Sequence, residues 1–139
     1  MQKDDIPEIW DIEQVSFPAP WVKESFLSEM YRKEAISKVA VFEHKVIGYL
    51  CTNYRLHEAY LLKLAVHPDF RRQGVATILM HEAKRQLKRR GCVFIYLKVR
   101  RSNLSAKTFY EQFGFKIETV RKKYYDDPDE DALLMMGRL

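Results

Sequence analysis

The sequence is poor in cysteine and has no arrangement of residues typical of a metal site. Its two cysteines, Cys51 and Cys92, are too few for a disulfide framework and lack the close pairing of a zinc or redox motif. The four histidines show no spacing typical of metal ligands. We therefore expect two buried thiols and no metal.

Long apolar runs are also missing. Stretches such as 93–97 fall far short of the ~20 residues that span a bilayer, and the polar, acidic start at 1–7 does not resemble a secretory signal. Repeats, low-complexity tails and linkers rich in proline, glycine and serine are absent too. We expect a cytoplasmic protein without membrane association, folded as one domain over residues 1–139.

The composition is that of an ordinary globular protein, with 47% hydrophobic and 31% charged residues. A net charge of +5 suits an anionic ligand or nucleic acid. Because this charge is modest and spread along the chain, it does not decide between them.

Helices are predicted from apolar stripes and from the residues that begin and end them. Asp5 and Glu8 have capping-box spacing and start a first helix, which the prolines at 18 and 20 end. Gly91 and Gly114 follow two later stripes as C-terminal caps. The other helices are expected over 21–31, 75–90 and 105–113.

Strands are predicted where β-branched and aromatic residues gather. The first two form a hairpin around a turn at His44-Lys45, and later strands alternate with helices, which predicts an α/β fold with a mixed sheet and helices on both faces. The strands are expected over 36–43, 46–54, 60–66, 93–99, 115–120 and 132–136.

A basic motif, Arg71-Arg72-Gln73-Gly74-Val75-Ala76, stands between the 60–66 strand and the helix that begins at Val75. A helix N-terminus offers unpaired N–H groups, and Gly74 and Ala76 would let a phosphate approach the backbone. The motif predicts a pyrophosphate cradle, although alone it is short enough to be an ordinary basic helix start. The chain has neither G-x-x-x-x-G-K-[ST] nor G-x-G-x-x-G, which argues against nucleotide hydrolysis and dinucleotide binding.

An ordered series of motifs makes the assignment more specific. The series runs Leu64-Ala65-Val66-His67-Pro68, Arg71 to Ala76, Val99 to Asn103, and Phe109 to Phe115 with Ala106. With this series the sequence resembles the GNAT acetyltransferases over nearly its whole length, which implies a GNAT fold with a mostly antiparallel sheet. Phe17-Pro18, Tyr124-Tyr125 and 130–132 further resemble the RimI-type ribosomal-protein alanine acetyltransferases and the archaeal Ard1-type N-terminal acetyltransferases.

The resemblance implies an enzyme that moves the acetyl group of acetyl-CoA, without a metal, to the α-amine of a protein, such as a ribosomal protein or nascent chain. It also implies residue roles. Tyr110 would be the general acid and Asn103 would contact the cofactor. Phe17, Pro18, Lys98, Tyr124 and Tyr125 would line the substrate site. The pantetheine arm would lie along Leu64, Ala65 and Val66, and the pyrophosphate along Arg71, Arg72, Gln73, Gly74, Val75, Ala76 and Thr77.

The chemistry of thioesters also favours a donor role for Tyr110. Attack of an amine on a thioester expels a thiolate, and a phenol of reference pKa about 10 within hydrogen-bond reach can donate to a thiol of about 8.5. The alternative is a packing role beside Phe109 and Phe113. Tyr124 and Tyr125 have a similar alternative, as cover for the core.

The sequence departs from the family pattern in two places. Only residues 1–4 are available for the strand that normally precedes the first helix, so that strand is short or absent. Lys98 stands where the RimI-type pattern has its proton-accepting glutamate. An ordinary lysine is protonated at neutral pH and cannot act as a base.

The missing base need not abolish activity, since a protein α-amine, with pKa about 7.7–8.0, is partly neutral near pH 7. Tyr60 could hold a water that collects the amine proton, as a matching tyrosine does in some eukaryotic N-terminal acetyltransferases, or could be a core residue. If Lys98 faces the amine site, its charge would attract an acidic substrate residue. Alternatively, it reaches into solvent.

Two other functions remain open. A GNAT enzyme that acetylates a lysine side chain or small amine would share the cofactor residues. A nucleic-acid or ribosome-binding module would use the basic residues at 84–90 and 121–123, but no nucleic-acid motif is present, and cations at a helix end are commonly a solvated face.

Overall fold

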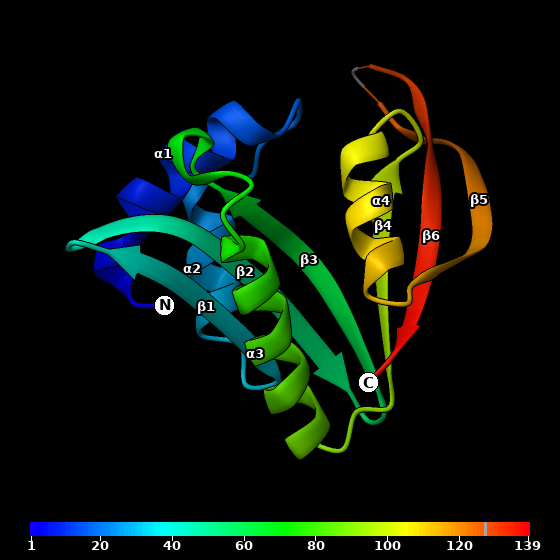
Figure 1. Cartoon of the computed structure of the whole chain (residues 1–139), viewed down its shortest axis with the longest axis horizontal. Coiled ribbons are helices and arrows are strands. Elements are labelled where there is room, and N and C mark those ends of the chain that lie inside the picture. Colours follow the sequence, from blue (N-terminus) through cyan, green and yellow to red (C-terminus); the bar gives the residue numbers. More distant parts are fainter. Residues whose placement is uncertain (127) are drawn as a thin grey trace.

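The computed structural model describes residues 1–126 and 128–139. The elements follow one another along the chain as Figure 1 labels them. They are a 3-10 turn η1 (Lys3–Asp5), α1 (Ile6–Ser16), α2 (Lys23–Met30), β1 (Ala35–Phe42), β2 (Lys45–Arg55), β3 (Glu58–Val66), a 3-10 turn η2 (Pro68–Phe70), α3 (Val75–Arg89), β4 (Phe94–Arg100), α4 (Leu104–Gln112), β5 (Lys116–Tyr125) and β6 (Glu130–Arg138).

The strands form one six-stranded sheet in the order β1-β2-β3-β4-β6-β5. Neighbouring strands are antiparallel except β3 and β4. The predicted mixed, mostly antiparallel sheet is therefore confirmed. The sequence predicted that the strand before the first helix is short or absent. Residues 1–5 contain η1 and no strand, so that strand is absent.

The single parallel pairing is short. β3 and β4 pair only where Glu58, Ala59 and Tyr60 face Phe94, Ile95 and Tyr96. Beyond these residues the two strands separate, so the sheet opens into a V (Figure 1). We call this opening the splay, and it lies between the predicted cofactor strand and the strand that carries Lys98.

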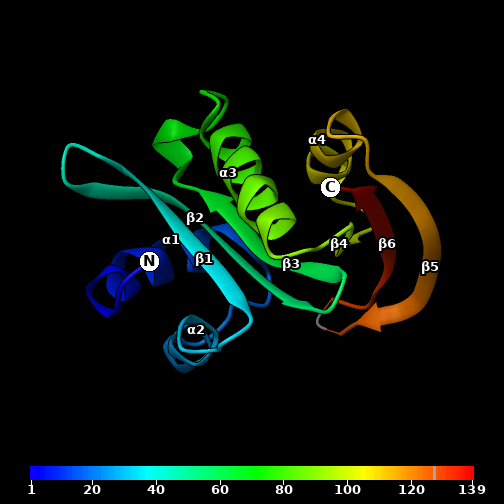
Figure 2. The same ribbon diagram turned by 90° about the horizontal axis from the view of Figure 1, so that it is seen from below.

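Helices cover both faces of the sheet, as predicted, with α1 and α2 on one side and α3 and α4 on the other (Figure 2). Under α1 and α2, Ile9, Phe26 and Tyr49 are fully buried. Under α3 and α4, a larger core includes Leu87 and Ile95. The two cores fix the helices on which the candidate site is built.

Some local predictions were wrong. Asp5 and Glu8 do not form a capping box: the Asp5 carboxylate accepts from the Gln2 N–H at 2.7 Å, and that of Glu8 accepts from the Val46 N–H at 2.9 Å, tying α1 to β2. β5 continues five residues past the predicted end at Val120, because a strand at the sheet edge tolerates exposed charged residues. No helix in the described ranges is both long and apolar enough to cross a membrane.

Candidate active site

Two cavities meet at the splay. One, of about 540 Å³, lies between the N-terminal end of α3 and α4, and we call it the α3–α4 cavity. The other, of about 710 Å³, lies over the opposite face of β3, β4 and β6, and we call it the sheet cavity. A ligand entering from one face of the sheet can therefore meet a ligand entering from the other. Both cavities are lined by Ser16, Phe17, Leu64, Asn103, Ala106 and Tyr110.

The start of α3 forms a concave backbone surface in the α3–α4 cavity. Arg72 and Gly74 have positive φ values of 61° and 83°, and the first helical hydrogen bond runs from the Ile78 N–H to the Gly74 carbonyl at 3.0 Å. The N–H groups of residues 75–77 therefore have no partner within the helix. Consecutive free N–H groups at a helix N-terminus suit an anion.

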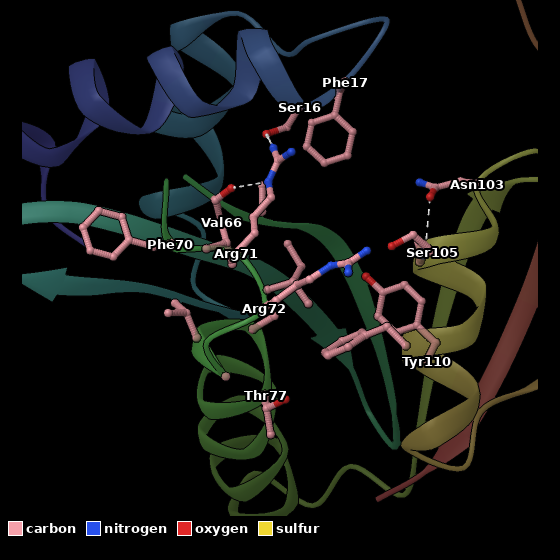
Figure 3. Close-up of a pocket in the computed structure, with 17 residues that line it drawn as sticks. Ser16, Phe17, Val66, Phe70, Arg71, Arg72, Thr77, Asn103, Ser105 and Tyr110 are labelled. Carbon is pink, nitrogen blue, oxygen red and sulfur yellow. Dashed lines mark hydrogen bonds between the residues drawn. The ribbon is translucent and has the colours of Figure 1, made fainter. Parts of the chain in front are cut away.

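The glycine leaves room for that anion. A Cβ placed on Gly74 would meet no atom within 4 Å, so the space in front of the loop is open. The Arg72 side chain extends across the cavity toward Tyr110 (Figure 3). The residues present thus fit a pyrophosphate, because they offer free backbone N–H donors, a positive charge and open space.

Two residues of the motif have other contacts. Arg71 donates from Nε to the Val66 carbonyl at 3.0 Å and from Nη2 to the Ser16 hydroxyl at 3.2 Å, so it joins the loop to the ends of β3 and α1 (Figure 3). Gln73 donates to the Asp69 carbonyl at 3.4 Å and does not line the cavity. The other predicted cofactor residues line it, namely Leu64, Ala65, Val66, Arg71, Arg72, Gly74, Val75, Ala76, Thr77 and Asn103.

Asn103 also organises α4. Its side-chain oxygen accepts from the Ala106 N–H at 3.2 Å and caps the helix, which leaves the amide nitrogen directed toward the cavity (Figure 3). Capping fixes the start of α4 and so fixes the helix that carries Tyr110.

Tyr110 lines both cavities, although it is only 8% exposed. Its ring packs against Phe109 and Phe115, with centroids 5.3 and 5.6 Å away, and its hydroxyl points into the α3–α4 cavity (Figure 3). Burial raises the pKa of Tyr110 above its ordinary value, so the hydroxyl remains protonated and able to donate. The packing role and the donor role are therefore compatible.

The sheet cavity contains the predicted substrate residues. Along β4 the buried Ile95, Leu97 and Val99 face the core, and Lys98 takes the opposite face, as strand alternation predicted. The Lys98 ammonium lies 3.4 Å from the Tyr124 hydroxyl and 5.0 Å from the centroid of its ring. The lining also includes Phe17, Pro18, Tyr60 and Tyr125.

Tyr60 is not a core residue, because 39% of it is exposed. Its hydroxyl donates to the Glu58 carboxylate at 2.9 Å, and its ring stacks on that of Tyr96 at 5.9 Å. The bond to Glu58 raises the pKa of Tyr60. Glu58 thus supplies a carboxylate in this cavity that sequence reasoning did not identify.

Sequence reasoning also missed a buried ion pair beside the cavity. Glu13, fully buried in α1, lies 2.8 Å from the Lys63 ammonium, accepts from the Trp21 N–H at 2.9 Å and accepts from the Tyr49 hydroxyl. Lys63 lies over the ring of Phe17 at 3.9 Å. A glutamate on the apolar face of α1 and a lysine within an apolar strand each indicate a buried charge. Because 50 residues separate the two in the sequence, the sequence alone does not show that they pair.

Cys51 and Cys92 are both buried free thiols, as predicted. Among residues 1–126 and 128–139, no group of three or more His, Cys, Asp or Glu side chains is placed to hold a metal ion.

The acetyltransferase (GNAT) family matches residues 6–115. A ribosomal protein bS18-alanine N-acetyltransferase of Salmonella typhimurium is 34% identical over 133 residues, covering 94% of this chain and 89% of that protein.

Solved structures agree with this match. The ribosomal-protein-S18-alanine N-acetyltransferase from Escherichia coli has a TM-score of 0.90 and 32% identity, covering 99% of this chain and 90% of that one. Ard1 from Thermoplasma volcanium has a TM-score of 0.91 and 26% identity, covering 100% and 94%. The chain therefore belongs to the GNAT family of acetyltransferases, as its motifs predicted.

Proposed function

We propose that the chain transfers the acetyl group of acetyl-CoA to the α-amine of a protein N-terminus. One observation carries this proposal: the two cavities meet at the splay, and Tyr110 lines both. The names of the relatives from Salmonella typhimurium and Escherichia coli, which specify a ribosomal-protein alanine, support a protein substrate.

In this proposal the α3–α4 cavity holds acetyl-CoA. The free N–H groups at residues 75–77 and the Arg72 guanidinium bind the pyrophosphate, and the unpaired side of β3 at 64–66 binds the amide-bearing arm. Bound acetyl-CoA supplies an acetyl group activated as a thioester, whose transfer forms an amide and releases a thiol.

Tyr110 donates toward the sulfur as it departs. Burial raises the pKa of Tyr110, so full proton transfer from its hydroxyl to a thiolate is uphill, and its main contribution is a hydrogen bond that strengthens as negative charge develops on the sulfur. The thiolate takes its proton from solvent after it has left. The neighbouring rings of Phe109 and Phe115 restrict the Tyr110 ring to one position.

The sheet cavity holds the amine. Phe17, Pro18 and Trp21 form an apolar wall for the first residue of the substrate. Tyr60, hydrogen-bonded to Glu58, orders the water that accepts the amine proton. Because the carboxylate lies behind a hydroxyl, this is a weak base system, and it favours an α-amine of pKa about 7.7–8.0 over a lysine side chain of about 10.4.

The partner in this proposal is the free N-terminus of a ribosomal protein or nascent chain in the cytoplasm. Basic residues at the end of α3 would contribute only incidentally, by contact with ribosomal RNA.

Mass spectrometry of peptides incubated with acetyl-CoA tests the proposal. Each peptide should carry one internal lysine and exist in two forms, with a free or a blocked N-terminus, and spermidine should represent small amines. We expect acetyl groups on free α-amines and little on lysine or spermidine. Acetylation of lysine or spermidine with unmodified α-amines would contradict the proposal.

A further inference from the structure

The face of β4, β6 and β5 that borders the sheet cavity carries two cations. Lys98 on β4 pairs with Leu134 on β6, and Arg121 on β5 pairs with Ala132, two residues along the same strand. Directly paired residues, and residues two apart, share a face of a sheet. Lys98 and Arg121 therefore lie on one face, two strand spacings apart across the sheet and two residues apart along it, or about 12 Å in all, with Leu134 between them, and all three line the cavity.

The other charged groups around this cavity already have partners. Glu58 accepts from Tyr60, Lys63 pairs with Glu13, and Arg100 lies 3.5 Å from Glu130. In the described part of the chain, the Tyr124 hydroxyl is the polar contact found for Lys98, and no ion pair is found for Arg121. Among the described residues that line this cavity, Lys98 and Arg121 are therefore the two cations without an oppositely charged partner, and the lining around Leu134 is positive. Glu118 on β5, whose charge acts on Tyr96, does not line the cavity.

We propose that Lys98 and Arg121 form a subsite that binds an acidic side chain at the second or third position of the substrate, so that the enzyme prefers protein N-termini with Asp or Glu there. This inference rests on the proposed function. An extended peptide advances about 3.3 Å per residue, so when its α-amine reaches the splay, these positions extend over β4 and β6.

The same charges act on the amine itself. Lys98 repels a protonated α-amine and so favours the neutral form, which is the form that reacts. The cation beside the apolar wall of Phe17, Pro18 and Trp21 is the Lys63 ammonium, 3.9 Å from the Phe17 ring centroid. Because Lys63 is already paired with Glu13 at 2.8 Å, it is not free to bind an acidic first residue. The positive surface is therefore suited to the residues that follow the first one.

Matched peptides test the subsite. The panel begins with Ala and carries Glu, Gln or Lys at the second or the third position, and kcat/KM is measured at low and high salt. At low salt we expect kcat/KM for the Glu peptides to exceed that for the Gln peptides about fivefold, because a partly exposed ion pair strengthens binding by about that factor. The Lys peptides should have a lower kcat/KM than the Gln peptides. The difference should shrink in about 0.5 M salt because exposed charges are screened.

Three single variants locate the effect. Lys98→Gln and Arg121→Gln should each reduce the Glu-to-Gln ratio to about twofold. Lys122→Gln, which removes an equal charge from the same strand at a residue that does not line the cavity, should leave the ratio unchanged. Lys98→Glu should reverse the ranking of the Glu and Lys peptides.

The outcomes separate this subsite from the proposed function. If α-amines are acetylated but Glu and Gln peptides react equally, the subsite is wrong and the function stands. If Lys122→Gln lowers the ratio as much as Arg121→Gln does, general surface charge is responsible and the subsite is wrong. If spermidine is acetylated and no peptide α-amine is, both proposals are wrong.

Discussion

Replacing Glu13 with glutamine should destabilise the protein by about 3 kcal/mol, the low end of the cost of breaking a buried ion pair. The glutamine amide can still bond to the Trp21 N–H and the Tyr49 hydroxyl, so the main loss is the anion that faces Lys63 at 2.8 Å. The cost is at the low end of this range because the Lys63 side chain is 11% exposed and its ammonium still lies over the ring of Phe17, 3.9 Å from the centroid.

The expected loss is large enough to measure in two ways. Unfolding entropy near 60 °C is about 2.1 cal/mol/K per residue, so 3 kcal/mol corresponds to a Tm lower by about 10 °C for a chain of 139 residues. Urea unfolding at pH 7 should show a lower midpoint with an unchanged m value. Glu8→Gln is the matched control, because Glu8 is also on α1 and also accepts a backbone N–H, but it is only partly buried and has no buried cation facing it in the described part of the chain. It should cost less than about 1 kcal/mol.

A double-mutant cycle with Lys63→Met identifies the interaction. The double variant Glu13→Gln/Lys63→Met removes both charges. Its loss of unfolding free energy should be about 2 kcal/mol smaller than the sum of the losses of the two single variants. Additive effects, or a Glu13→Gln cost equal to that of Glu8→Gln, would refute this reasoning. Because Lys63 contacts Phe17, Glu13→Gln should also raise KM for peptides more than KM for acetyl-CoA.

Three further predictions concern the site and the core. Gly74→Glu should weaken acetyl-CoA binding at least tenfold by calorimetry, since it places a carboxylate among the phosphate donors and strains a φ of 83°; unchanged affinity would remove the cradle assignment. Tyr110→Phe should keep that affinity but lower turnover by about 10²–10³-fold, the usual cost of removing one hydrogen-bond donor to developing negative charge, and full turnover with chemistry rate-limiting would leave Tyr110 a packing role only. Burial raises the folded-state pKa of Tyr49 and Tyr110 above their unfolded value of about 10, so the stability that they contribute is present below pH 10 and lost above it. The free energy of unfolding should fall above pH 10 by up to about 1.4 kcal/mol per pH unit for each tyrosine, and Tyr49→Phe should make that fall shallower.

Local signals in the sequence predicted much of the fold. The apolar stripe and Gly91 predicted α3 to within one residue of its observed end, and alternation along β4 put Lys98 on the correct face. The GNAT family was predicted from the spacing of short motifs and is confirmed. These features depend on residues close together in the chain, so a sequence can reveal them directly.

Features that depend on distant residues, or on the rotamers of nearby side chains, were not predicted. Glu8 had the spacing of a capping residue, but Val46, 38 residues away, offers it an N–H. The Glu13–Lys63 pair and the Glu58–Tyr60 bond form only when helices and strands are packed together or side chains turn to meet. Gln73 belongs to a recognised motif, yet its side chain bonds to Asp69, because motif membership does not fix a rotamer.

The splay gives the sheet two internal edges in addition to its two outer ones. Past Tyr60, β3 presents backbone donors and acceptors to a gap instead of to β4. Exposed edges invite strand addition and aggregation in most proteins, but here the edge lies inside a cavity too confined for another folded chain. A thin ligand with evenly spaced amides can occupy it and complete the ladder. Ligand binding then finishes the sheet, so those backbone amides at 62–66 that point toward the gap and not toward β2 should exchange with solvent far more slowly in the complex than in the free protein.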